Sequence, residues 1–383
     1  MRTTLTLSTL MLATALPVHA LEDGVVTIWT GANRDKAQLE GAAAIFTEEL
    51  GIEVRVEVVD PDLPQNYQKA AATGDGPDIV MWAHDRFGEW ASGGLIQPVA
   101  PSAAWRDGIL PAALEAVQFD GKTWGYPVAV EAVTLIYNTD LVDTPPESFE
   151  ALAEAGEAAI LWDYNNAYFT MPLLMANGGY AFEKIDGVYD GTTTGVNAEG
   201  SVAGAQALRA LFDAGVMPQG VDYGVMDGAM ANGDVAMVLN GPWSWPAYQE
   251  AGISIAVAPI PTVAGNAAPP FLGVQALAIN AASPNADLAV ELIENYLLTD
   301  EGLAGWNANG ALGALADISA AEAQQDPLVS GMLAVAADGV PMPSNPEMGA
   351  FWAAMAPALT NITSGTLPPE KALDDAAARI LSE

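Results

Sequence analysis

Hydrophobic and polar positions along this chain fall into segments that switch between strand and helix periodicity. Residues 25–29 and 52–59 follow the two-residue period of a strand, and residues 36–50 between them repeat apolar positions at helical spacing. Gly51 ends that helix. A strand, a helix and a second strand in this order are typical of a βαβ unit. The N-terminal part of the sequence therefore predicts α/β architecture.

The segment 73–90 combines a turn, a buried strand and a group of polar and aromatic side chains. A Gly- and Pro-rich turn precedes the apolar run 78–83, which is typical of a parallel strand covered on both faces. Trp82, Asp85 and Arg86 stand at its carboxyl end, where open α/β sheets bind ligands. An aromatic ring beside planar hydrogen-bonding groups fits a neutral sugar, which offers a C–H face and vicinal hydroxyls.

The rest of the chain continues this alternation. The apolar run 128–138 is long enough to be one strand that passes from one domain to another, and 273–280 is a candidate for the return. Residues 122–130 are hairpin-like, and 187–195 form a polar loop. We expect further strands at 159–162, 235–239 and 253–258, helices at 67–72, 85–93, 149–157, 171–176, 198–214, 227–232, 286–298 and 301–307, and a mainly helical remainder from 326.

Length and charge narrow the class of protein. A chain of 383 residues exceeds one ordinary core and predicts about two domains. Hydrophobic residues make up 51% and charged residues only 16%, which indicates a folded globular protein. With 48 acidic residues against 12 scattered basic ones, nucleic-acid binding is excluded, because phosphate neutralisation needs clustered Lys or Arg. Anionic membrane surfaces are disfavoured for the same reason.

Residues 1–20 are typical of a secretory signal. Arg2 is a short basic region, 5–16 is a mostly apolar core, and 18–20 is a small-x-Ala cleavage site. The alternative, a membrane anchor, is disfavoured because the apolar run is shorter than the roughly 18 residues that span a bilayer. The chain has no Cys, so it lacks the acceptor for an N-terminal lipid and cannot form disulfides. We expect a freely soluble periplasmic protein.

The inventory of side chains excludes most catalytic chemistry. After residue 20 the chain has a single His, His84, and no Cys, so Ser-His-Asp triads, Cys-His pairs and His-rich metal sites cannot form. We expect no metal and no cofactor, and a structural role for His84. A glycoside hydrolase needs only two carboxylates, and Asp85 with Glu131 is the available pair. That enzyme remains the alternative from another functional class.

A series of motifs extends over nearly the whole chain after residue 20. They are AATGDGPDI (71–79), WAHDRF (82–87), VAVEA (128–132), LIYN (135–138), GGYAF (178–182), NGPWSW (240–245), INAASPN (279–285), NYLLTDEGL (295–303) and AFW (350–352). In these motifs and their order the chain resembles the periplasmic maltose/maltodextrin-binding proteins, a group of extracellular solute-binding proteins.

The resemblance implies a two-lobed α/β periplasmic binding protein of type II, with a ligand cleft between lobes joined by a hinge that the chain crosses about three times. Residues 21–130 and 274–325 would form the N-terminal lobe, and 131–273 and 326–383 the C-terminal lobe, after the signal peptide 1–20. Hinges of this kind close by changing a few backbone torsions.

The resemblance also implies a set of ligand contacts and two inward-facing neighbours, Trp245 and Phe351. Three of the contacts have other interpretations. Trp82 could be a core residue, and Asp85 and Arg86 could pair with each other at the surface. Glu131 lies in an apolar run, so its carboxylate must be paired or face a wet cleft. The full set is Asn33, Arg34, Trp82, Ala83, Asp85, Arg86, Glu131, Asn166, Tyr168, Trp243, Met342 and Trp352.

By this resemblance the protein would capture maltose or maltodextrins as a monomer and deliver them to an inner-membrane ABC maltose permease. Trehalose or sucrose remains an alternative ligand, and the sequence leaves open whether a chemoreceptor is also a partner. Several positions depart from the better-known relatives; the core subsites look intact and the outer ones stripped, which favours short over long oligosaccharides. These are Asn33-Arg34 in place of Asp-Lys, Asn166-Ala167-Tyr168 in place of Glu-Pro-Tyr, Pro64-Gln65 in place of acids, and Ala353 and Ala356 in place of Tyr and Arg.

Overall fold

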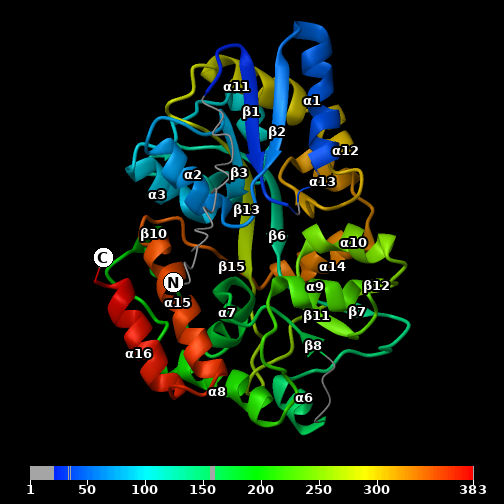
Figure 1. Ribbon diagram of the computed structural model, residues 1–383, viewed down its shortest axis with the longest axis vertical. Coiled ribbons are helices and arrows are strands. Elements are labelled where there is room, and N and C mark those ends of the chain that lie inside the picture. The colour runs from blue at the N-terminus through cyan, green and yellow to red at the C-terminus, as the bar shows by residue number, and fades with distance from the viewer. Residues whose placement is uncertain (1–20, 33, 35, 156–159, 383) are drawn as a thin grey trace, which may run out of the picture.

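The computed structural model describes residues 21–32, 34, 36–155 and 160–382. Two β-sheets lie one above the other along the long axis of the molecule, each with helices around it (Figure 1). We call the elements around the seven-stranded sheet the upper half and those around the four-stranded sheet the lower half. The predicted mixed α/β class is confirmed. The predicted signal peptide, Asn33 and the first residue of the predicted strand 159–162 lie outside the described residues.

The upper sheet has the strand order β14-β6-β13-β3-β1-β2, with β15 pairing with β13. β1 is parallel to β2 and β3, as the βαβ pattern predicted, whereas β13 is antiparallel to β3 and β6. The strands are β1 (Val25–Thr30), β2 (Glu53–Val58), β3 (Ile79–Ala83), β6 (Tyr126–Ala132), β13 (Phe271–Ile279), β14 (Ala314–Leu315) and β15 (Val340–Pro341). The helices are α1 (Lys36–Leu50), α2 (Leu63–Ala71), α3 (Phe87–Ser92), α4 (Ala103–Asp107), α5 (Pro111–Ala116), α11 (Ala286–Leu292), the π-helical turn η3 (Ile293–Leu297), α12 (Asp300–Trp306) and α13 (Ile318–Ala323).

The lower sheet has the order β12-β7-β11-β8. Its strands are β7 (Thr134–Asn138), β8 (Ile160–Leu161), β11 (Met237–Asn240) and β12 (Ile255–Ala258). The helices are α6 (Phe149–Ala155), α7 (Ala167–Met175), α8 (Glu199–Asp213), α9 (Tyr223–Ala231), α10 (Trp245–Glu250), α14 (Pro327–Ala336), α15 (Met348–Thr363) and α16 (Pro369–Ile380). Two short antiparallel pairs, β4 (Gln118–Phe119) with β5 (Lys122–Thr123) and β9 (Glu183–Ile185) with β10 (Val188–Asp190), stand apart from both sheets.

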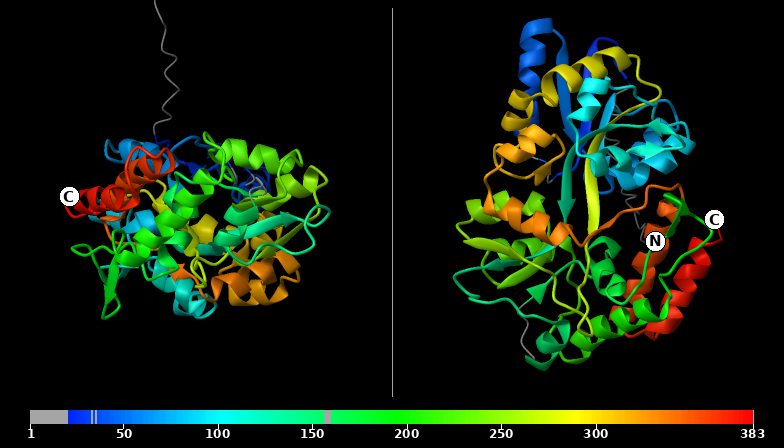
Figure 2. Two further views of the ribbon diagram at one scale, coloured as in Figure 1. Left: turned by 90° about the horizontal axis from the view of Figure 1, so that it is seen from below. Right: turned by 180° about the vertical axis from the view of Figure 1, so that it is seen from behind.

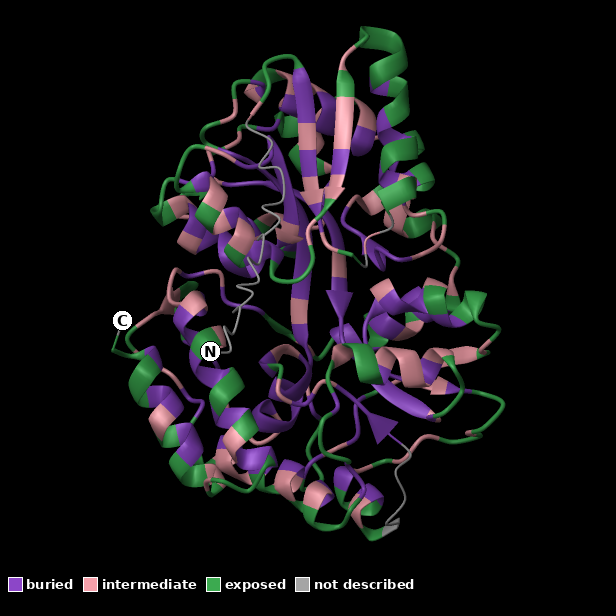
Figure 3. Ribbon diagram, viewed as in Figure 1, coloured by how far each residue is buried: buried purple, intermediate pink, exposed green. Residues whose placement is uncertain are grey.

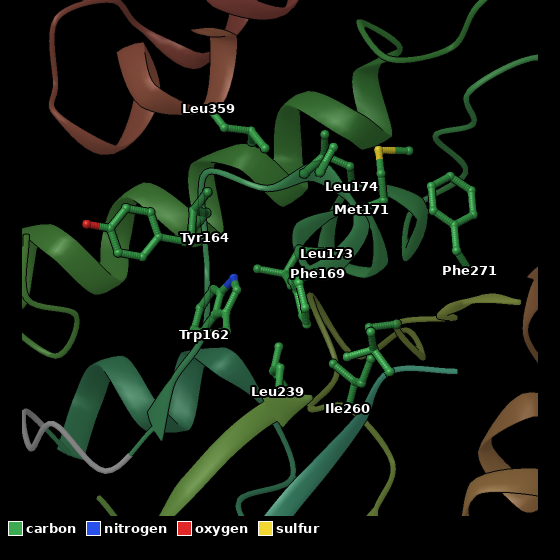
Figure 4. Packing of buried hydrophobic residues seen from close by; sticks show 14 of the residues in the cluster. Trp162, Tyr164, Phe169, Met171, Leu173, Leu174, Leu239, Ile260, Phe271 and Leu359 are labelled. Carbon is green, nitrogen blue, oxygen red and sulfur yellow. The ribbon is translucent and has the colours of Figure 1, made fainter. Parts of the chain in front are cut away.

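Each half has its own hydrophobic core. Buried residues follow the sheets and the inner faces of the helices, and exposed residues lie on the outer helix faces (Figure 3). In the lower half, aromatic and aliphatic side chains from α7, β8 and β11 converge, among them Trp162, Phe169 and Leu239 (Figure 4). The Trp162 indole Nε1 donates to Thr170 Oγ1 at 3.0 Å, so this buried ring leaves no unpaired N–H. Within the described residues, no helix is both long and apolar enough to cross a membrane.

Three interpretations of the sequence were wrong. The run 128–138 is not one strand: β6 and β7 belong to different sheets, and Val133 separates them. Residues 122–130 are not a hairpin, because β5 pairs with β4 while β6 pairs with β13. The segment 187–195 is not all loop, since β10 pairs with β9 across a tight turn at Asp186 and Gly187, which both have positive φ. β6 and β7 have partners distant in sequence, whereas β4–β5 and β9–β10 are local pairs that the sequence analysis missed.

The connection between the halves includes a two-stranded ribbon. β6 and β13 run side by side through the centre of the molecule, as the view from behind shows (Figure 2). Glu131 lies opposite Gly273 near the lower end of this ribbon. The pairing shifts register between Gln275 and Ala276, which is a β-bulge.

Candidate functional site

Most of the predicted site residues lie where the two halves meet. The upper half contributes Arg34 after β1, residues 82–86 at the end of β3 and in η1 (His84–Arg86), and Glu131 on β6. The lower half contributes Tyr168 on α7, Trp243 on η2 (Pro242–Ser244) and Trp352 on α15. The carboxyl end of β3 thus carries polar groups toward this junction, as expected for an open α/β sheet.

Asp85 and Trp352 connect the halves by a hydrogen bond. Trp352 Nε1 donates to Asp85 Oδ2 at 2.9 Å, and Asp85 is buried. Burial raises the pKa of Asp85 to about 6, against the opposing effects of the Arg86 charge and the Trp352 hydrogen bond. The alternative of an Asp85–Arg86 surface pair is wrong, because Arg86 is also buried and forms its ion pair with Glu89 at 3.2 Å.

Glu131 is paired with two side chains of the upper half. Arg34 approaches both carboxylate oxygens, with Nη1 2.9 Å from Oε2 and Nη2 donating to Oε1 at 3.2 Å. Gln275 Nε2 on β13 also donates to Oε1, at 2.8 Å. A nearly buried carboxylate with a guanidinium and an amide as partners has the compensation that its burial requires. The Glu131 carboxylate is therefore fixed in position by Arg34 and Gln275 at the edge of the junction.

Two aromatic rings of the lower half lie beside this ion pair. The Arg34 guanidinium lies over the Trp243 ring, 5.4 Å from its centroid, and Tyr168 lies 6.1 Å from Trp243 between ring centroids. The Tyr168 hydroxyl is buried and has no hydrogen-bond partner among the residues that the structure describes. Burial raises the pKa of Tyr168 well above its usual value, and the negative charge of Glu131 adds to this effect. A ligand hydroxyl at this position would satisfy the Tyr168 oxygen.

Trp82 and the chain around Met342 frame the same region. Trp82 is partly buried and packs against two of the hydrophobic clusters. Ala83 is buried at the end of β3, and Met342 is buried on the segment that follows β15. His84 Nδ1 accepts the Val274 N–H at 3.1 Å, so Nε2 carries the proton that is donated to the Met342 carbonyl oxygen at 2.9 Å. Burial lowers the pKa of His84 to about 4, and this neutral ring has the structural role we predicted.

Asn166 is a member of the predicted set whose side chain forms local hydrogen bonds. It is exposed and caps α7, with its Oδ1 accepting the Tyr168 N–H at 3.1 Å. It also hydrogen-bonds Asp163, whose pKa burial raises to about 6. Its role as a ligand contact therefore competes with two local hydrogen bonds.

The aromatic pairs divide as the sequence analysis expected. Trp245 and Phe351 are buried, whereas Trp243 and Trp352 are partly exposed. The structure adds Gln275, which the sequence analysis missed. A lone polar residue in the apolar strand β13 is the same signal that identified Glu131 on β6.

Two cavities are relevant to assigning the site. One of about 510 Å³ lies between α2, α3 and α15, and its walls include Arg86 and Trp352 together with Gln65 and Ala353. A larger cavity of about 710 Å³ lies between α10, α12 and α13, and none of its lining residues belongs to the predicted set. The smaller cavity adjoins the converging polar and aromatic groups, which makes it the better candidate. In the described part of the chain, no cluster of three or more acidic or His side chains is arranged to hold a metal ion.

Comparison with known proteins identifies related chains. Residues 41–331 match the family model described as bacterial extracellular solute-binding protein. The chain is 28% identical to the maltotriose-binding protein of Pyrococcus abyssi over 88% of this chain and 77% of that protein. It is 27% identical to the galactooligosaccharide-binding protein of Bacillus subtilis over 92% and 87% of the two chains. It is 26% identical to a maltooligosaccharide ABC transporter solute-binding lipoprotein of Streptococcus pneumoniae over 90% and 85%.

Proposed function

The chain belongs to the family of bacterial extracellular solute-binding proteins, and from that premise we propose that it captures a maltose-type oligosaccharide and delivers it to an ABC importer. The observation that carries the choice of ligand is the Asp85–Trp352 contact across the two halves, beside a cavity of about 510 Å³. An indole with a fixed plane offers a stacking face, and the adjoining Asp85 and Arg86 offer planar groups for vicinal hydroxyls.

The ligand would lie in a cleft between two lobes of a type II periplasmic binding protein. Residues 21–130 and 274–325 would form one lobe, and 131–273 and 326–383 the other. Support comes from the separate sheets and cores and from the passage of β6 and β13 between them. We propose that the protein is a monomer in the periplasm, released from a cleaved signal peptide, and that relative motion of the lobes encloses the sugar.

Ligand contacts would come from the converging side chains. Trp82, Trp243 and Trp352 would stack on sugar rings, Asp85, Arg86 and Glu131 would bind hydroxyls, and Tyr168 would use its unpaired hydroxyl. Arg34 lies over the Trp243 ring, so a sugar that stacks there contacts or displaces the guanidinium. Ala83, Met342, Asn33 and Asn166 complete the proposed set.

Related proteins are named for maltotriose, maltooligosaccharides and galactooligosaccharides, so the sugar must be measured. Trp fluorescence and calorimetric titration with maltose, maltotriose, trehalose and sucrose would identify it. We expect saturable binding of maltose or maltotriose. Absence of binding to all four sugars would refute the proposal. Gln65 and Ala353 line the open space beside Trp352. We predicted a preference for short sugars, and tighter binding of maltotriose than of maltose would contradict it.

The competing function, a glycoside hydrolase with Asp85 and Glu131, makes a different prediction. Glu131 is paired with Arg34 and Gln275, and Asp85 accepts the Trp352 N–H. Neither carboxylate is therefore available to activate a water molecule. We therefore expect no glucose release from maltose under saturating conditions. Steady release that Glu131→Gln abolishes would establish the hydrolase instead.

A further inference from the structure

The Trp243 indole is tied to a polar network in the lower half. Its Nε1 donates to the Tyr223 hydroxyl oxygen at 3.1 Å. Tyr223 is the first residue of α9, and the Asp222 side chain caps that helix by accepting the Val225 N–H at 2.9 Å. The partner of Trp243 is therefore mounted on a helix whose start is fixed by its own cap.

The network continues from Tyr223 to a carboxylate. Hydrogen bonds from Tyr248 and Tyr223 lower the pKa of Asp227, while burial, the larger effect, raises it. Tyr248 donates to Asp227 Oδ1 at 2.8 Å, and Asn240 Nδ2 donates to the Tyr248 oxygen at 2.9 Å. Asp227 thus accepts from the Tyr248 hydroxyl and lies near that of Tyr223. A Tyr223 proton directed to Asp227 leaves a lone pair of its oxygen for the Trp243 N–H.

Gly241 constrains the same ring from its backbone. A Cβ added at Gly241 would lie 2.2 Å from Cη2 and Cζ3 of Trp243, so the ring occupies the space of a side chain. The φ of Gly241 is −117°, a value that any residue adopts, so the glycine is needed for space and not for backbone freedom. Its N–H is donated to Asn240 Oδ1 at 2.9 Å, which joins this contact to the same network.

We propose that Tyr223 is a positioning residue for Trp243: its hydroxyl, oriented by Asp227, fixes the angle of the indole and thereby sets the affinity for ligand. The inference rests on the proposed function, because it takes Trp243 as a surface on which a saccharide stacks. A ring held at its N–H edge and against Gly241 loses little freedom when the ligand arrives. A ring without the Tyr223 contact loses its rotational freedom only when the ligand binds, and this loss opposes binding.

The test combines a signal from the indole with a measurement of binding. The chain has ten Trp residues, and in protein with ¹⁵N-labelled indoles Trp243→Phe identifies the Trp243 signal. In Tyr223→Phe we expect that signal to move and its proton to exchange faster with water. The Kd for maltotriose should rise about two- to tenfold, the equivalent of one lost hydrogen bond.

Tyr248→Phe is the matched control. It removes a hydroxyl bonded to the same carboxylate but not to Trp243, so it should lower the unfolding temperature and change the indole signal and the affinity less than Tyr223→Phe does. The proposal fails if Tyr223→Phe leaves the Trp243 signal in place, or moves it without a change in Kd. If the wild-type protein binds no saccharide, the proposed function fails, and the indole signal still decides whether Tyr223 positions the ring.

Gly241→Ala tests positioning without removing any hydrogen-bonding group. The added methyl group must displace the Trp243 ring, so we expect the Kd for maltotriose to rise about tenfold or more and the indole signal to move. Gly228→Ala on α9 is the control, because a Cβ there meets no atom within 4 Å. Equal affinity of Gly241→Ala and wild type would show that the angle of Trp243 is unimportant and would overturn the proposal.

Discussion

Trp243 and Trp352 are both partly exposed indoles at the junction, but they are held in opposite ways. Trp243 donates its N–H to a neutral hydroxyl, that of Tyr223, within its own half of the molecule. Trp352 donates to the carboxylate of Asp85 in the other half, and its ring packs edge-on against Phe351 with centroids 4.8 Å apart. The hydrogen bond of Trp243 therefore lies within one half, and that of Trp352 crosses the junction.

This difference separates two properties of the site. The hydrogen bond of Trp243 lies within its own half, so it should persist when the relative position of the halves changes, although Arg34 of the other half also contacts the ring. The contact of Trp352 depends both on that relative position and on the ionisation of Asp85, whose pKa is raised to about 6. We therefore expect pH and lobe movement to change the hydrogen bond of Trp352 and to leave that of Trp243 in place.

The largest expected effect is on the free energy of unfolding, and it distinguishes the two partly exposed rings from a Trp of the core. Trp245 is buried at 1% exposure two residues from Trp243, so Trp245→Ala should lower the free energy of unfolding by roughly 3–5 kcal/mol. Trp243→Ala and Trp352→Ala should cost less stability, because their rings are partly exposed. Urea denaturation of the three variants measures this. A stability loss for Trp352→Ala equal to that for Trp245→Ala would assign Trp352 to the core and break the comparison.

The next effect is a pH dependence specific to the Trp352 side. Because the pKa of Asp85 rises from 3.8 to about 6 on folding, the folded chain binds this proton more tightly than the unfolded chain. The resulting stabilisation is complete below about pH 4 and is lost as the pH rises through about 6. The unfolding free energy of wild type relative to Asp85→Asn should therefore fall by about 2 kcal/mol between pH 4 and pH 7. If the difference in unfolding free energy between wild type and Asp85→Asn stays constant with pH, Asp85 is not the origin of the pH dependence.

The affinity contributed by stacking is smaller than these stability effects. A sugar ring that covers an indole face buries roughly 60–80 Å² of apolar surface, which at about 25 cal/mol per Å² amounts to about 1.5–2 kcal/mol. Trp352→Ala should weaken maltose binding at least about tenfold, since each 1.4 kcal/mol or so changes affinity by that factor. Calorimetry on Trp82→Ala, Trp243→Ala and Trp352→Ala measures each ring. Wild-type affinity together with a lower unfolding temperature would exclude that ring from the site.

Salt should have the smallest effect, and one that does not distinguish the two rings. The formal net charge is −36, so exposed carboxylates repel one another and screening should stabilise the fold. We expect the unfolding temperature to rise by a few degrees between low salt and 1 M sodium chloride, where the Debye length is about 3 Å. An unfolding temperature that is flat or falls with sodium chloride would contradict this expectation.

Local periodicity predicted the elements whose partners are close in sequence. Helix α1 begins and ends at the predicted residues, because its apolar face and the Gly51 stop are both local signals. The run 128–138 was misassigned because no local signal marks the point where β6 leaves its pairing with β13 and β7 begins pairing with β11 and β12. Assignment to a sheet is a property of partners, and these lie more than a hundred residues away.

The candidate site shows the same limit at the level of side chains. The motif NGPWSW places two indoles near a strand end, but which ring faces inward depends on the space over Gly241 and on Tyr223. Tyr223, Asp227 and Tyr248 were overlooked because α9 and α10 bring them together with Asn240 only in the folded chain. Glu131 was easier, since an acid inside an apolar strand has few explanations.

The ribbon formed by β6 and β13 also has a mechanical consequence. Two hydrogen-bonded strands resist stretching along their length but twist readily, and two-stranded ribbons show the widest range of twist. We expect the relative motion of the halves to be mainly a torsion about this ribbon. Glu131 and Gln275 are joined across it, and points on a torsion axis travel least. Glu131 would then move little, whereas the rings of Trp243 and Trp352, which lie farther from the axis, would rotate around it.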